Sequence, residues 1–141
     1  MRAHILTPVL GLIVWTFAMW FWMYATRIPA LRAAGLDPAR IKRKDDIEML
    51  PVAVKQVADN YNHLHEQPTV FYALVFYCYL VGVADPLNVG LAWAYVALRV
   101  VHSVIQSTVN YTPVRFSVFS LASIVLMIIA ARNVLALVVT R

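Results

Sequence analysis

The chain has 141 residues, of which 62% are hydrophobic and 13% are charged, and its formal net charge is +5. A soluble domain carries about 25% charged residues, and a domain this small must leave much of its surface in water. The composition therefore excludes a soluble globular domain, a disordered chain, collagen and a disulfide scaffold. The basic residues form no continuous stripe, so no nucleic-acid partner is predicted. The lone cysteine, Cys78, lies in an apolar run with no metal-ligand set around it, and no metal site is predicted.

A membrane-spanning helix needs about 20 mostly apolar residues. The length therefore suits an all-α integral membrane four-helix bundle, with residues 1–141 as one domain. The first span is predicted to be a retained transmembrane helix rather than a signal peptide, because no small-residue cleavage site follows it. Its end is predicted at Arg27 to Pro29. The second is predicted as one long helix that begins near Pro51 and bends at Pro68. The predicted spans are residues 5–27, 52–83, 89–111 and 114–138.

The basic residues predict the orientation. With four spans, eight of them fall on one side of the membrane and three on the other. Cytoplasmic loops carry the excess of Lys and Arg, so residues 28–51 are predicted to be cytoplasmic and both termini to lie on the opposite side. The larger group is Arg27, Arg32, Arg40, Lys42, Arg43, Lys44, Lys55 and Arg115, and the smaller is Arg2, Arg132 and Arg141.

Polar residues inside the 52–83 helix form the first candidate cluster. Asp59, Asn62, His63 and Glu66 are spaced i, i+3, i+4, i+7, which places them on one helical face. Pro68 frees a backbone carbonyl four residues earlier, within the same cluster. The alternative is that this stretch is simply the water-exposed end of a long helix.

A second polar face lies in the 89–111 span. It consists of Arg99, His102, Ser103, Gln106 and Asn110. An arginine in a span costs about 2.5 to 3.5 kcal/mol on insertion scales, so Arg99 is predicted to pair with a carboxylate, and Glu66 is nearest in depth. The alternatives are hydrogen bonds between helices and a structural Arg–Glu pair that binds no ligand.

Arg27 and Arg115 lie at the predicted cytoplasmic ends of the first and fourth spans. Either alone is typical of an interfacial anchor. Together with the two polar faces they place basic groups from three helices at one depth. This arrangement indicates a site for an anionic, hydrophilic ligand that enters from the cytoplasm, beside a lipophilic reactant from the bilayer.

Three motifs carry a family resemblance: Asn62-His63-Leu64-His65-Glu66-Gln67-Pro68, Arg99-Val100-Val101-His102-Ser103 and Arg115-Phe116-Ser117. In this order and spacing the chain resembles the MAPEG family, the membrane-associated proteins of eicosanoid and glutathione metabolism. The resemblance implies a homotrimer that binds glutathione between adjacent subunits. It suggests glutathione contacts at Arg27, Asn62, Glu66, Arg99 and His102, and the two polar faces add His63 and Gln106.

The resemblance also implies that Arg115 stabilises the glutathione thiolate. A neighbouring guanidinium lowers the pKa of a thiol, which is about 8.5 when free. Two departures from the family stand out. Asp59 and Asn62 occupy positions where glutathione-using members often have arginine, and Gln106 occupies a position where several have tyrosine.

The leading hypothesis is a membrane-bound, glutathione-dependent transferase or peroxidase acting on a lipophilic electrophile or lipid hydroperoxide. One alternative is a non-catalytic lipid-binding or scaffold protein of the same fold. The other is a small four-helix multidrug transporter, which would need an acidic residue in an early span, and residues 5–26 contain none.

Overall fold

The computed structural model describes residues 2–140, and this part of the chain is helical with no strand. The predicted all-α class is confirmed. Short 3-10 helices occur at the N-terminus and in the first loop. The elements in chain order are η1 (Arg2–Leu6), α1 (Thr7–Ala33), η2 (Pro38–Arg40), η3 (Lys44–Ile47), α2 (Val52–His63), α3 (Gln67–Val81), α4 (Pro86–Ser107) and α5 (Thr112–Val139).

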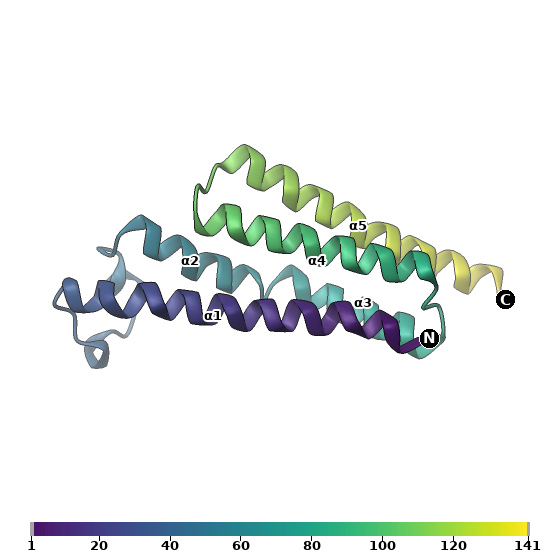
Figure 1. Cartoon of the computed structure of the whole chain (residues 1–141), viewed down its shortest axis with the longest axis horizontal. Helices are drawn as coiled ribbons and strands as arrows, with labels where there is room; N and C mark the ends of the chain where they lie inside the picture. Colours follow the sequence, from purple (N-terminus) through teal and green to yellow (C-terminus); the bar gives the residue numbers. More distant parts are fainter. Residues whose placement is uncertain (1, 141) are drawn as a thin grey trace.

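The helices form an up-and-down bundle in which α2 and α3 follow one another as a broken second rod (Figure 1). Both ends of the chain lie at one end of the bundle, and the loop between α1 and α2 lies at the other (Figure 1). Among the described residues, three segments are long and apolar enough to cross a membrane: His4–Ala33, Pro86–Ser107 and Thr112–Val139. The 15 residues of α3 span about 22 Å, short of the roughly 30 Å hydrocarbon core, so α2 must complete the second crossing.

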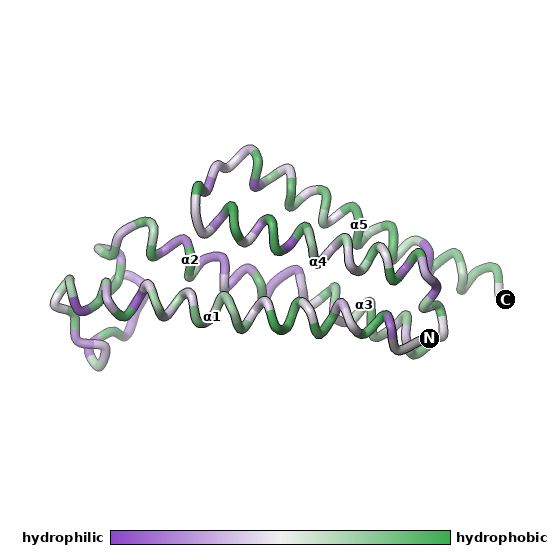
Figure 2. Tube along the Cα trace, viewed as in Figure 1, coloured by the Kyte–Doolittle hydropathy of each residue, from purple (hydrophilic) through white to green (hydrophobic). Residues whose placement is uncertain are grey.

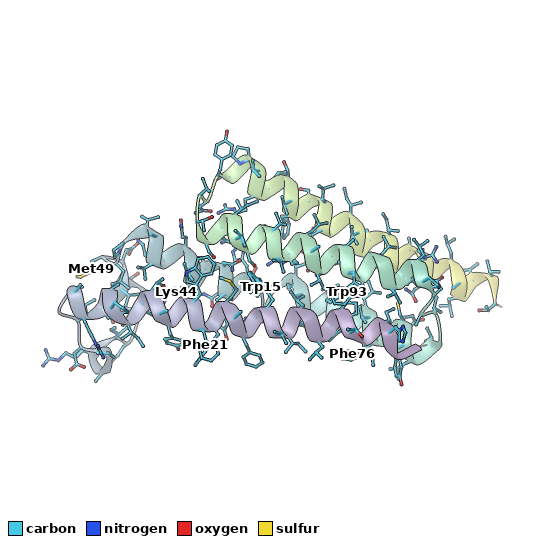
Figure 3. All side chains as sticks on the ribbon, viewed as in Figure 1. Trp15, Phe21, Lys44, Met49, Phe76 and Trp93 are labelled. Atoms are coloured by element: carbon cyan, nitrogen blue, oxygen red, sulfur yellow. The ribbon has the colours of Figure 1, made fainter. Side chains whose placement is uncertain are left out.

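Apolar residues cover both the inside and the outside of the bundle. Leu12, Met19 and Phe71 are fully buried, and the Phe71 ring stacks on Tyr95 with ring centroids 4.6 Å apart. Phe21 and Phe76 project outward (Figure 3) and are largely exposed. The hydrophilic colour concentrates in the first loop and along α2 (Figure 2). The chain is therefore an integral membrane helical bundle whose outer apolar surface suits lipid.

The predicted end of the first span is wrong, because α1 continues through Pro29 to Ala33. It stops at Gly35, which has a φ of +68°. The Leu36 N–H donates to the Leu31 carbonyl at 3.0 Å and the Gly35 N–H donates to the Arg32 carbonyl at 3.1 Å, as in a Schellman motif. The glycine that allows this left-handed turn, rather than the proline, sets the helix end.

The predicted continuous helix over residues 52–83 is also wrong. The chain leaves the helix at Leu64, and Glu66 has φ −99° and ψ −95°. Across the break the His65 and Glu66 N–H groups donate to carbonyls three residues earlier. Pro68 cannot donate to the Leu64 carbonyl and instead occupies the first turn of α3. The expected bend is therefore a full interruption.

The last two helices differ modestly from prediction. α4 begins at Pro86, three residues before the predicted 89–111 span, because the Asp85 carboxylate accepts from the Asn88 N–H at 2.8 Å and caps the helix. It ends at Ser107, so Asn110 lies outside the helix. α5 slightly exceeds the predicted 114–138 span. Near its far end Arg132 donates to Asp85 at 2.5 Å and to Asn88 at 2.9 Å, tying α5 to the start of α4.

Candidate functional site

Four side chains of the predicted α4 face are buried together: Arg99, His102, Ser103 and Gln106 are each at most 3% exposed. This part of the prediction is confirmed, because α4 turns one polar face into the bundle. Asn110 does not belong to it, since the helix has already ended.

The predicted Arg99–Glu66 ion pair is absent from the described part of the chain, where no carboxylate oxygen lies within 4.0 Å of the guanidinium. The Arg99 Nε and Nη2 atoms are buried without a hydrogen-bond partner. Both side-chain amide atoms of the fully buried Asn60, which comes from α2, are also without a partner. Buried polar atoms normally have partners, so this interior is built for groups that the chain alone does not supply.

A cavity of about 220 Å³ lies beside α4, where α5 begins. We call it the Arg115 cavity, and its lining residues are His63, Glu66, His102, Thr112, Arg115, Phe116 and Phe119. The His102 ring faces His63, with centroids 6.5 Å apart, and Phe119, with centroids 6.1 Å apart. The structure thus brings together four of the eight predicted site residues: His63, Glu66, His102 and Arg115.

Arg27 and Asn62 line a different space, a cleft of about 490 Å³ between the end of α1, the first loop and α2. We call it the Arg27 cavity. Its other lining residues are Lys44, Asp45, Ile47, Glu48, Val52, Lys55, Ala58 and Asp59. The helix break separates Glu66 from Asp59 and Asn62. His63, the last residue of α2, already lines the Arg115 cavity although it precedes the break. The predicted single face of the second helix is therefore divided between two cavities.

Arg115 is the principal charge of the Arg115 cavity. Its Nη1 donates to the side-chain carbonyl of Asn110, and within the described residues it forms no ion pair with a carboxylate. Phe116 and Phe119 supply an apolar wall beside it. An unneutralised guanidinium can hold an anion or a thiolate, and an aromatic wall can hold an apolar reactant next to it.

Sequence reasoning missed several residues of this region. Phe119 was unremarkable in a largely apolar span, and Phe116 was noted only as part of the Arg115-Phe116-Ser117 motif. Gln56 and Asn60 are one helical turn apart and both buried, and this spacing could have indicated them. The Gln56 Nε2 donates to the Thr108 carbonyl at 2.8 Å, which fixes α2 against the end of α4.

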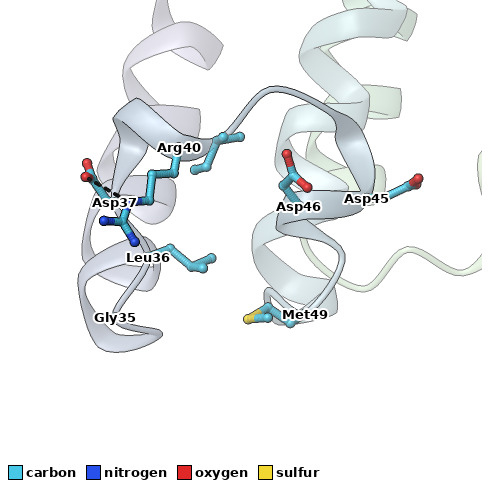
Figure 4. A pocket seen from close by; sticks show the side chains of 8 residues that line it. Gly35, Leu36, Asp37, Arg40, Asp45, Asp46 and Met49 are labelled. Carbon is cyan, nitrogen blue, oxygen red and sulfur yellow. Dashed lines mark ion pairs between the residues drawn. The ribbon is translucent and has the colours of Figure 1, made fainter.

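A further pocket of about 490 Å³ lies in the first loop, between Gly35 and Met49 (Figure 4). Its walls include the Asp37–Arg40 ion pair, whose closest atoms are 3.9 Å apart. Asp46 accepts hydrogen bonds from the Lys42 and Arg43 N–H groups, and these bonds lower the pKa of its carboxyl group. None of the predicted site residues lies here, so we treat this pocket as part of the loop's own architecture.

A bundle of membrane-crossing helices with buried cationic and imidazole side chains defines a helical membrane protein with a polar interior site. The chain belongs to the MAPEG family, which it matches over residues 5–135. This confirms the resemblance inferred from the motifs. Neither a curated protein nor a solved structure matches the chain.

Proposed function

We propose that the protein is a membrane-bound, glutathione-dependent transferase or peroxidase that acts on a lipophilic electrophile or lipid hydroperoxide. The observation that carries the proposal is Arg115, which has no carboxylate partner among the described residues 2–140 and lies in a cavity walled by Phe116 and Phe119. Membership of the MAPEG family, the membrane-associated proteins of eicosanoid and glutathione metabolism, supports it.

The proposed chemistry begins with the glutathione thiol. Arg115 stabilises the thiolate, and the proton passes to solvent. The thiolate then attacks the electrophile, forming a carbon–sulfur bond and displacing a leaving group or adding to a double bond. With a lipid hydroperoxide it attacks the peroxide oxygen, which gives a sulfenic acid and the lipid alcohol. A second glutathione then converts the sulfenic acid to a disulfide and water.

We propose that the predicted glutathione contacts come from more than one subunit. Within one chain Arg27 and Asn62 line one cavity, whereas Arg115 lines another. We therefore propose a homotrimer in which the Arg27 cavity of one subunit faces the Arg115 cavity of its neighbour. In this arrangement the unpartnered Arg99 and His102 contribute from the same side as Arg115. Crosslinking or native mass spectrometry of the detergent-solubilised protein tests the trimer.

We also propose that the loop between α1 and α2 faces the cytoplasm, because eight basic residues fall on its side of the bundle and three on the other. The chain offers Asp37, an exposed loop residue, as a labelling position. In intact cells, a cysteine introduced by Asp37→Cys should resist a membrane-impermeant thiol reagent and should react after lysis. If the reagent labels this cysteine in intact cells, the loop lies outside the cytoplasm and the proposed orientation is wrong.

A non-catalytic lipid-binding protein of the same fold is the second candidate. Gln106 favours it, because this residue is buried within α4 at a position where several family members place tyrosine, and Gln106 does not line the Arg115 cavity. The tyrosine hydroxyl that would assist a thiol is therefore missing from that position.

The two candidates are separated by titrating the purified protein with glutathione and measuring conjugation of a lipophilic electrophile. We expect saturable binding at millimolar glutathione or below and a large loss of conjugation in Arg115→Ala. Arg40→Ala is the matched control, since Arg40 is an exposed loop arginine far from the cavity and should be neutral. Absence of binding, with lipid retained by the purified protein, would favour the lipid-binding candidate.

A further inference from the structure

We infer that Asn110 is a positioning residue that aims the Arg115 guanidinium into its cavity while leaving the positive charge free for an anion. The inference rests on the proposed function, because it concerns the thiolate that Arg115 would stabilise. It begins from the backbone of the turn that joins α4 to α5.

Asn110 is the one non-glycine residue of the described chain with a positive φ, at +50°. L-residues seldom adopt this left-handed conformation, and asparagine tolerates it better than most. The turn is held from both sides. The Asn110 N–H donates to the Ile105 carbonyl at 2.7 Å, and Gln56 from α2 donates to the Thr108 carbonyl at 2.8 Å. The backbone position from which the Asn110 side chain projects is thus fixed.

The side chain of Asn110 contacts Arg115 in the first turns of α5. The Arg115 Nη1 donates to the Asn110 side-chain carbonyl, and the two residues are five apart in sequence. A glycine would adopt the left-handed conformation more easily, but it would supply no acceptor. Asparagine is therefore suited to both tasks, making the turn and holding the guanidinium.

A neutral acceptor also differs from a charged one. A carboxylate at this distance would form an ion pair and cancel much of the field that Arg115 offers to an anion. The amide orients the guanidinium without neutralising it. The other titratable side chains that line this cavity are His102 from α4, His63 from α2 and Glu66 from the break before α3. Glu66 is the one carboxylate that lines the cavity, and it lies beyond ion-pair distance of Arg115.

Three variants separate these roles. Asn110→Gly keeps the turn and removes the acceptor, whereas Asn110→Asp keeps an acceptor and adds a negative charge. Val109→Ala is the control, because Val109 belongs to the same turn, is highly exposed and lies outside the cavity. Thermal unfolding in detergent establishes that each variant folds.

The first readout is the pH dependence of thiolate absorbance for glutathione bound to the purified protein, together with kcat and KM for conjugation. In Asn110→Gly we expect the apparent pKa of the bound thiol to rise and kcat to fall about tenfold, as for one lost hydrogen bond to a charged group, with a smaller change in KM. In Asn110→Asp we expect a larger fall. Wild-type values in Asn110→Gly, or activity in Asn110→Asp equal to wild type, would overturn the inference.

The second readout needs no glutathione. Phenylglyoxal modifies free guanidinium groups, and mass spectrometry follows its reaction at Arg115. We expect faster modification in Asn110→Gly than in wild type or Val109→Ala, and equal rates would contradict the positioning role. If wild-type protein binds no glutathione, the proposed function fails. The role of Asn110 in orienting Arg115 would then be tested by the rate of phenylglyoxal modification alone.

Discussion

Replacing Arg99 by methionine should make the protein more stable and prevent it from responding to glutathione. The Arg99 side chain is 1% exposed, and neither its Nε nor its Nη2 has a hydrogen-bond partner. An arginine placed in a span costs about 2.5 to 3.5 kcal/mol on insertion scales. Methionine keeps the long unbranched stem and removes the charge, so most packing contacts are retained. We expect Arg99→Met to gain about 2 kcal/mol in free energy of unfolding, because loss of the cation is only partly offset by repacking.

The assay is thermal or SDS-induced unfolding of detergent-purified protein, with and without glutathione. If glutathione binds the folded state, wild-type protein gains about 2.7 kcal/mol at a concentration a hundred times the Kd. Arg99→Met should gain none. Arg132→Met is the matched control, because that arginine is paired with Asp85, and its loss should lower stability. An Arg99→Met protein that is less stable than wild type would show that Arg99 is a structural element of the fold, and the reasoning would fail.

Two further predictions concern residues outside the candidate site. At the far end of the bundle, Asp85 both caps α4 and pairs with Arg132. Asp85→Ala should therefore cost about 2 kcal/mol in unfolding free energy, and Asp85→Asn, which can still cap, about 1 kcal/mol; equal losses would refute the separate capping role. In the loop, hydrogen bonds from the Lys42 and Arg43 N–H groups lower the pKa of Asp46. The ionised Asp46 carboxylate should therefore stabilise the loop fully at pH values above its unfolded-state pKa. This stabilisation should be lost as the pH falls through the lower pKa of the folded state. An NMR titration of the loop amides checks this, and Asp46→Asn should abolish the transition.

The sequence predicted the helical class well because lipid imposes a simple rule. Every backbone polar group in a membrane must be satisfied internally, so long apolar runs become helices. The apolar stretches of α1, α4 and α5 were found for this reason. Their ends were less predictable, since Gly35 rather than Pro29 ends α1 and the Asp85 cap begins α4. A single capping residue outweighs the average composition of the segment around it.

The positions of the polar side chains were predicted to different degrees. The polar face of Arg99, His102, Ser103 and Gln106 was correct, because one unbroken helix preserves the periodicity of 3.6 residues. The face from Asp59 to Glu66 was only partly preserved, since the helix is interrupted after His63 and Glu66 lies beyond its end. His63 is still in the helix but lines the Arg115 cavity, whereas Asn62 lines the Arg27 cavity. Periodicity places residues on a face only while the backbone hydrogen bonds continue.

The sequence by itself determined that the protein lies in a lipid bilayer, that it is helical and that it belongs to its family. It also identified the polar and charged residues that are costly to place in a membrane span. Those features follow from composition, from local period and from short motifs, each of which involves neighbours in the chain. Tertiary structure alone decided that Arg99 has no carboxylate partner within the described part of the chain, that Arg27 and Arg115 line separate cavities and that Asn110 holds Arg115. These depend on the direction of side chains after a helix break and a left-handed turn, which no periodic pattern encodes.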